Sequence, residues 1–182
     1  MNLYGYAGGD PINYSDPFGL CKTEAGDDRP CAVHWVGGSR GQPSEAAMAH
    51  AQRLAERADV DLYISDGNRD PATDCSQGGR TPASRHNCGL AYDIAAIGID
   101  GAVLDFGTDY VGANPAALQG AMRVQAAALG MHDTREVFGP AGLFRNSTSG
   151  TTSVSWERTR SASDWVLSWG HKGHVHVSLQ TP

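Results

Sequence analysis

Two short segments contain the residues best suited to metal chemistry. The first, SRHNCGLAYD at residues 84–93, has six residues between His86 and Asp93. This spacing does not put both on one helix face, but it suits ligands at either end of a turn that leads into a strand. Imidazole nitrogens and carboxylate oxygens are both zinc ligands. Gly89 permits the turn, and Ala91 is small enough to pack closely beside a metal.

The second segment is HKGHVHV at residues 171–177. In a strand, alternate side chains point to the same face, so His174 and His176 are expected to point one way and Val175 and Val177 into the core. A single His-x-His pair is often no more than a surface feature. Combined with the first segment, however, it supplies the three protein ligands of a catalytic zinc site that keeps one position for water.

The elements that must position these residues follow from hydrophobic periodicity and turn residues. Ser44 suits the N-cap of an amphipathic helix. Asn114 suits the cap of a second helix, with Pro115 at its first position. The predicted elements are a short strand at 32–36, a helix at 45–58, strands at 61–65 and 89–97, a helix at 114–130, an exposed loop or hairpin at 139–163 and a strand at the end of the chain. This pattern predicts an α+β domain.

Composition excludes several classes of function. The 182-residue chain has 14 Lys and Arg against 20 Asp and Glu, a net charge of -6. Sequence-independent nucleic-acid binding relies on basic residues facing phosphates, so we expect no nucleic-acid partner. No apolar run approaches the roughly 20 residues needed to span a bilayer. The sequence also lacks the basic-then-apolar pattern of a secretory signal, so we expect another protein or domain to carry it out of the cytoplasm.

The four cysteines form two sequence-local pairs, Cys21 with Cys31 and Cys75 with Cys88. Disulfides within these pairs are the favoured prediction, and they would suit an oxidising compartment such as a periplasm. Four cysteines allow three connectivities. Free thiols, or a metal-ligand role for Cys75 or Cys88, remain the alternatives.

Residues 1–20 resemble the end of the core of RHS-repeat proteins. The similarity lies in NLYGY and in Pro11, four residues, and then DPFGL, the P-x4-D-P-x-G-L pattern of that family. There the motif separates a conserved shell from a variable C-terminal toxin. The resemblance implies autocleavage after Leu20, with Asp10 and Asp16 as the candidate aspartates. It divides the chain into an RHS tail at 1–20, a tether at 21–43 and a toxin domain at 44–182.

The two histidine segments resemble motifs of the LAS metallopeptidases, which include the D-Ala-D-Ala metallopeptidases. Residues 84–93 match S-x-H-x-x-G-x-A-x-D, and residues 171–176 match a second motif, H-x-x-H-x-H. Upstream, ISDGNRDP at 64–71 resembles the segment that places an arginine in the site. The resemblance implies an α+β fold in which a small antiparallel sheet carries one zinc ion and is flanked by two main helices.

This resemblance also implies roles for individual residues. His86, Asp93 and His176 would bind the zinc. His171 matches the histidine taken as general base in the carboxypeptidase branch. Many relatives instead use an acidic residue three positions before the last ligand, where this chain has Gly173.

Three further residues take roles from the same resemblance. His174 would lie near the metal and orient water or the oxyanion, and whether it or His171 is the base stays open. Arg69 would face the scissile carbonyl or a substrate carboxylate. Ser84 would bind substrate or support the loop.

The function implied is that of a zinc peptidase that cuts the D-alanine-containing stem peptides of peptidoglycan, as either a carboxypeptidase or an endopeptidase. As the tip of an RHS effector delivered by a type VI or similar secretion system, it would act in the periplasm of a rival bacterium. Its expected partners are the RHS shell and a cognate immunity protein. The alternatives are a metal-dependent nuclease toxin and a non-catalytic zinc-binding module.

Overall fold

The computed structural model describes residues 20–22, 28–38, 41–68, 85–107, 114–140, 142–146, 156–158, 171 and 173–180. Five residues given a role or a disulfide by the sequence lie outside these ranges: Asp10, Asp16, Arg69, Cys75 and Ser84.

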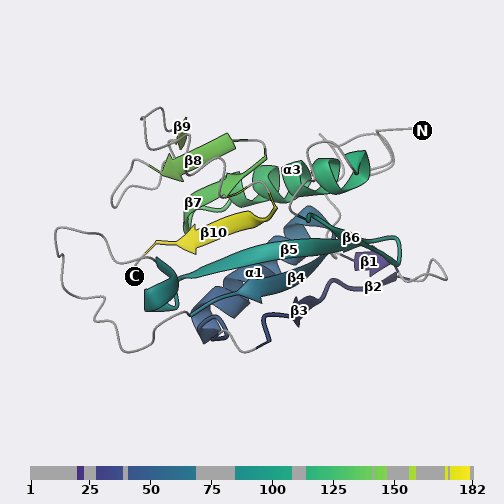
Figure 1. The fold of residues 1–182 in the computed structure, drawn as a ribbon, viewed down its shortest axis with the longest axis horizontal. Helices are drawn as coiled ribbons and strands as arrows, with labels where there is room; N and C mark the ends of the chain where they lie inside the picture. Colours follow the sequence, from purple (N-terminus) through teal and green to yellow (C-terminus); the bar gives the residue numbers. More distant parts are fainter. Residues whose placement is uncertain are drawn as a thin grey trace.

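An eight-stranded sheet forms the framework of the described domain (Figure 1). Its strand order is β3-β4-β5-β10-β7-β8-β9, and β6 also pairs with β5. All of the described pairings in it are antiparallel except that of β3 with β4. The strands are β3 (Val33–Trp35), β4 (Asp61–Asp66), β5 (Ala91–Ile99), β6 (Ala102–Asp105), β7 (Thr134–Gly139), β8 (Gly142–Asn146), β9 (Trp156–Arg158) and β10 (Val175–Leu179).

The α+β prediction is confirmed, but the sheet is larger than predicted and mixed rather than antiparallel. The parallel pair has a simple cause, because helix α1 (Glu45–Ala58) connects β3 to β4, and parallel neighbours need a crossover of this kind. The region 139–163, predicted as a loop or hairpin, contains β8 and β9, which pair antiparallel as in a hairpin.

Both predicted helices are present, with the predicted caps. The Ser44 hydroxyl accepts a hydrogen bond from the Ala47 amide at the start of α1. The Asn114 side chain accepts two amide hydrogen bonds at the start of α3 (Pro115–Leu129), where the proline occupies the first turn. No helix within the described ranges is long and apolar enough to cross a membrane.

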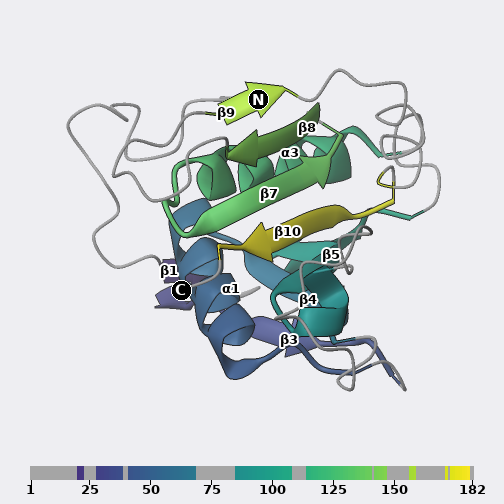
Figure 2. The same cartoon turned by 90° about the vertical axis from the view of Figure 1, so that its left-hand side faces the viewer.

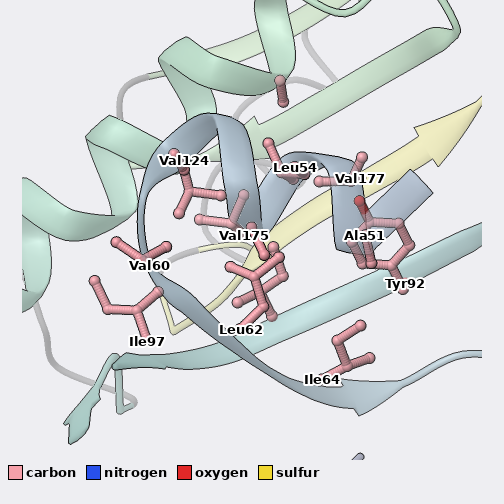
Figure 3. Close-up of a cluster of buried hydrophobic side chains, with 14 of the residues drawn as sticks. Ala51, Leu54, Val60, Leu62, Ile64, Tyr92, Ile97, Val124, Val175 and Val177 are labelled. Carbon is pink, nitrogen blue, oxygen red and sulfur yellow. The ribbon is translucent and has the colours of Figure 1, made fainter. Parts of the chain in front are cut away.

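Side chains from both helices meet the sheet in one buried cluster. Figure 2 shows the helices and the sheet after a quarter turn. Figure 3 shows Leu54 of α1 near Val177 of β10, and Val124 of α3 nearer to Val175 of the same strand. On β5, Tyr92 and Ile94 belong to this cluster. Because strand side chains alternate, Asp93 between them points to the face of the sheet away from the helices.

A small disulfide-bonded hairpin precedes the main sheet. Strands β1 (Leu20–Lys22) and β2 (Asp28–Pro30) form a separate antiparallel sheet, in which Leu20, the residue before the predicted cleavage bond, pairs with Pro30. A Cys21–Cys31 disulfide joins the hairpin, as predicted, and both cysteines are buried. Cys88 is disulfide-bonded too, and is therefore no free metal ligand. The segment expected to be a tether thus contributes ordered strands to the domain.

Polar contacts hold this hairpin against the domain. The Arg29 guanidinium pairs with the Asp61 carboxylate at the start of β4, and the same carboxylate accepts a hydrogen bond of 2.8 Å from the Ala32 amide. The Gln52 side chain of α1 donates to the Cys31 carbonyl at 2.7 Å. These contacts connect the hairpin to both a strand and a helix of the main domain.

Removing the disulfide should lower stability measurably. The closed loop spans a sequence separation of 10, for which chain entropy gives about 3 kcal/mol of stabilisation. We expect the Cys21→Ala/Cys31→Ala variant to lose about this much free energy of unfolding, measured by urea denaturation. A loss below about 0.5 kcal/mol would mean that the polar contacts alone hold the hairpin.

A buried histidine connects α1 to two strands of the sheet. His50 is fully buried; its Nδ1 lies 2.8 Å from the Tyr92 hydroxyl and its Nε2 lies 2.9 Å from the Thr134 hydroxyl. Burial lowers its pKa from 6.5 to about 4, with Asp133 opposing that shift and Arg53 adding to it. Burial also raises the pKa of Tyr92, which keeps that hydroxyl protonated as a donor. The sequence suggests only a surface or packing role for His50, and the structure shows packing.

Acid should therefore weaken the fold through His50. A group whose pKa is lower in the folded state takes up its proton on unfolding, so its contribution is complete above about 6.5 and is lost as pH falls toward 4. We expect the free energy of unfolding to fall by about 2 kcal/mol between pH 7.5 and 5. His50→Gln, which can still form hydrogen bonds, should flatten this dependence. Urea denaturation with chelator in every buffer would measure it, and an equally steep dependence in the variant would contradict the prediction.

Candidate metal centre

Three side chains from separate elements converge on the face of the sheet away from the helices. His86 belongs to the short 3-10 helix η2 (Arg85–Cys88), Asp93 to β5 and His176 to β10. The atoms His86 Nε2, Asp93 Oδ1 and His176 Nδ1 are 2.8–3.2 Å apart. All three residues are at least nine-tenths buried, and together they form a group that could hold a metal ion.

Strand register explains why two of these residues meet. His176 lies directly opposite Asp93 in the antiparallel pair of β10 with β5. Residues that are direct cross-strand partners share a face and bring their side chains together. Val175 and Val177 are fully buried in the core on the other face, as the alternation predicts.

The third residue is placed by a turn that only glycine fits well. Gly89 has a φ of +66°, in the left-handed region, and a Cβ there would lie 3.2 Å from Cβ of Ser44. The Ser44 hydroxyl donates to the Gly89 carbonyl at 2.6 Å, which ties the turn to the start of α1. The predicted turn that leads from His86 into a strand is therefore present, and it is anchored to the helix cap.

The three candidate ligand atoms have too few protons to hydrogen-bond to one another, which favours a cation between them. His86 Nδ1 lies 2.8 Å from the Gly67 carbonyl, which can only accept, so in the neutral ring this nitrogen is protonated and Nε2 presents a lone pair. Asp93 Oδ1 also presents lone pairs, and His176 Nδ1 brings at most one proton. One proton cannot make three mutual hydrogen bonds, so a metal ion suits the site better.

The donor set also fits zinc by type and spacing. Zinc takes nitrogen and carboxylate ligands at about 2.0–2.1 Å in a tetrahedron, which places ligand atoms about 3.3 Å apart. A backbone carbonyl behind the second ring nitrogen, as Gly67 supplies for His86, is the usual support of a metal-binding imidazole.

The histidines beside Asp93 favour the ionised form of its carboxyl group. Burial opposes ionisation of Asp93, but hydrogen bonds and positive charge from His176 and His86 outweigh burial when these rings carry protons toward the carboxyl, and they hold its pKa well below its ordinary value. A metal ligand must be in its deprotonated form, so this environment prepares Asp93 for that role.

Two more histidines lie beside the three donors. His174 Nε2 is 3.7 Å from Asp93 Oδ1. The His171 ring centroid is 4.8 Å from that of His174 and 5.4 Å from that of His176. The structure thus gathers every histidine of the two predicted segments, with His174 closer than His171 to the donor oxygen of Asp93. The predicted partners Arg69 and Ser84 lie outside the described residues.

Phe138 is a neighbour of the site that the sequence analysis does not identify. It lies on β7 opposite His176, and the two rings are stacked with centroids 5.4 Å apart. Before Gly139, the segment has only Val137 and Phe138 as adjacent residues that favour strands. This pair is too short to predict a strand from the sequence alone.

A second group with metal-binding residue types is Cys21, Cys31 and Asp59. The two cysteines are joined in a disulfide, so they do not supply thiolate ligands. Among the described residues, the group of His86, Asp93 and His176 is therefore the candidate metal centre. Comparison of the chain with family models, with curated proteins and with solved structures finds no match.

Proposed function

We propose that this chain is a zinc-dependent peptidase that cuts the stem peptides of peptidoglycan, made as the C-terminal toxin of an RHS-repeat protein. One observation carries the proposal: His86, Asp93 and His176 bring three donor atoms within 3.2 Å of one another, beside two further histidines. Three protein ligands with a position left for water is the arrangement of catalytic rather than structural zinc sites.

Zinc held by these residues would act as a Lewis acid and lower the pKa of a coordinated water to about 7. The chain's own groups have separate tasks. Asp93 supplies a negative charge and His86 keeps its Nε2 lone pair directed inward through its bond to Gly67. In this proposal His171, whose ring lies next to those of His174 and His176, takes up a proton from water during its attack on a peptide carbonyl and returns it to the leaving amine.

The biological setting follows from the resemblance of residues 1–20 to the RHS core. In this proposal, a type VI or similar system delivers the domain to a rival's periplasm, and an immunity protein protects the producer. The disulfides at Cys21–Cys31 and at Cys88 support a working compartment that is oxidising.

Digestion of purified peptidoglycan tests the activity, with the muropeptides resolved by mass spectrometry. Wild type is compared with His86→Ala and with a chelated sample. Loss of a terminal alanine would identify a carboxypeptidase, and loss of cross-linked dimers an endopeptidase, provided that both controls are inactive. Unchanged muropeptides with zinc bound at full occupancy would overturn the proposal. Cleavage of DNA or RNA by the same sample would then favour a nuclease, and no turnover a binding module.

A further inference from the structure

One aromatic ring lies between the candidate metal centre and an arginine. Phe138 stacks on His176, with an angle of 23° between the ring planes. On its other side, the Arg145 guanidinium carbon lies 5.3 Å from the Phe138 centroid. Because β7 lies between β10 and β8, the histidine and the arginine approach this ring from opposite sides. Contacts of both kinds are favourable for an aromatic ring.

The arginine is itself held in place. Arg145 Nε donates to Glu136 Oε1 at 2.8 Å, and the Ser178 hydroxyl donates to Glu136 Oε2 at 3.1 Å. Glu136 is the cross-strand partner of both Arg145 and Ser178, so all three side chains lie on the same face as Phe138. The hydrogen-bonded side chains of Arg145, Glu136 and Ser178 limit the orientations that the Phe138 ring can take.

The same ring contacts the candidate base. Phe138 meets the edge of His171, with centroids 5.2 Å apart and an interplanar angle of 75°. His171 lies in a turn before β10, where no strand pairing holds it within the described ranges. Its ring contacts there are with Phe138, His174 and His176.

Phe138 is buried on the face of the sheet that carries the site, outside the core cluster. Phe138 is 4% exposed. Its neighbour Val137 belongs to the core cluster under the helices, and Phe144 of β8 packs against that cluster, but Phe138 does not belong to it. Strand alternation gives the reason, because Phe138 points to the opposite face from Val137.

We propose that Phe138 is a positioning residue that fixes the ring planes of His176, a metal ligand, and of His171, the proton acceptor. The part that concerns His171 rests on the proposed function. An imidazole that can rotate presents its lone pair to the metal for less of the time, so removal of the stacked ring should weaken metal binding and slow proton transfer together.

The test replaces the ring with an aliphatic side chain. For Phe138→Leu we expect zinc affinity, measured by chelator competition, to fall about 10-fold. The visible spectrum of the Co²⁺-loaded protein should change, and kcat on muropeptides should fall more than KM rises. Phe138→Tyr, which keeps the ring, should restore all three. The matched control is Phe144→Leu, the same change on the core face of the neighbouring strand, which should lower thermal stability without changing zinc affinity.

Equal effects of Phe138→Leu and Phe144→Leu on zinc affinity and on the Co²⁺ spectrum would overturn the proposal. Should Phe138→Leu not fold, Phe138→Met replaces it, with the same expected results. The metal measurements need no substrate. If Phe138→Leu changes zinc affinity but the wild-type protein shows no peptidase activity, the role of Phe138 toward His176 is supported and only the proposed function is contradicted. Phe138→Leu should lower kcat by a smaller factor in the His171→Ala variant than in the wild-type chain. If the factor is the same in both, the role of Phe138 toward His171 is contradicted.

Discussion

Replacement of Asp93 by asparagine should abolish tight metal binding while leaving a folded domain. The change keeps the side-chain volume but removes the one negative charge of the candidate metal centre, which the surrounding imidazoles hold in its ionised form. Removal of a supporting outer partner typically costs 10–100-fold in metal affinity. Loss of a direct anionic ligand should therefore cost more than about 100-fold, with peptidase activity falling in parallel.

Zinc affinity would be measured by chelator competition, and folding by thermal denaturation in the presence of chelator. Asp105→Asn is the matched control, because it makes the same change at an exposed position on β6, away from the three donors. It should bind zinc as wild type does. An Asp93→Asn variant that binds zinc within a few-fold of wild type would show that His86, Asp93 and His176 are not the metal ligands.

Local signals were sufficient to predict the elements that carry this site. The caps Ser44 and Asn114 act within one helical turn, and the helices begin after them as predicted. The turn between His86 and Asp93 depends on a nearby glycine. In each case the residues that determine the structure are close in the sequence, so the pattern alone is informative.

The geometry of the site could not be predicted in the same way. The hydrogen bond between His176 and Asp93 joins residues 83 positions apart in the sequence, and it depends on the register of β10 against β5. Register is set by packing of the whole buried face, which no short segment encodes. The resemblance to LAS metallopeptidases supplied the pairing of the two segments, and the structure supplies the distances.

The role of Phe138 and the hydrogen-bond network of His50 were not predicted, for a related reason. Each acquires its role from partners far away in the sequence: His176 for Phe138, and Tyr92 and Thr134 for His50. A lone histidine in an amphipathic helix predicts neither burial nor a hydrogen-bond network. Both residues become interpretable only after the sheet has brought β5, β7 and β10 together.

The two histidines beside the three donors should have separable roles. His174 Nε2 is 3.7 Å from the donor oxygen of Asp93, so it lies next to the metal position. His171 lies further from the metal position, where it contacts Phe138 and His174. We expect His171→Ala to lower kcat by about 100-fold or more, the range of a general base, with zinc affinity within a few-fold of wild type. We expect His174→Ala to lower zinc affinity by about 10–100-fold, as loss of a supporting group does.

Steady-state kinetics on a purified muropeptide, together with chelator competition, would separate these effects. Added imidazole should restore part of the activity of His171→Ala, because the missing group is a proton acceptor and the removed side chain leaves space for it. The same addition should not restore zinc affinity in His174→Ala. The opposite pattern, with affinity lost in His171→Ala and kcat alone lost in His174→Ala, would exchange the two roles and make His174 the base. The positions of the two rings relative to Asp93 argue for the first pattern, since a group in contact with a ligand oxygen affects the metal before it affects the substrate.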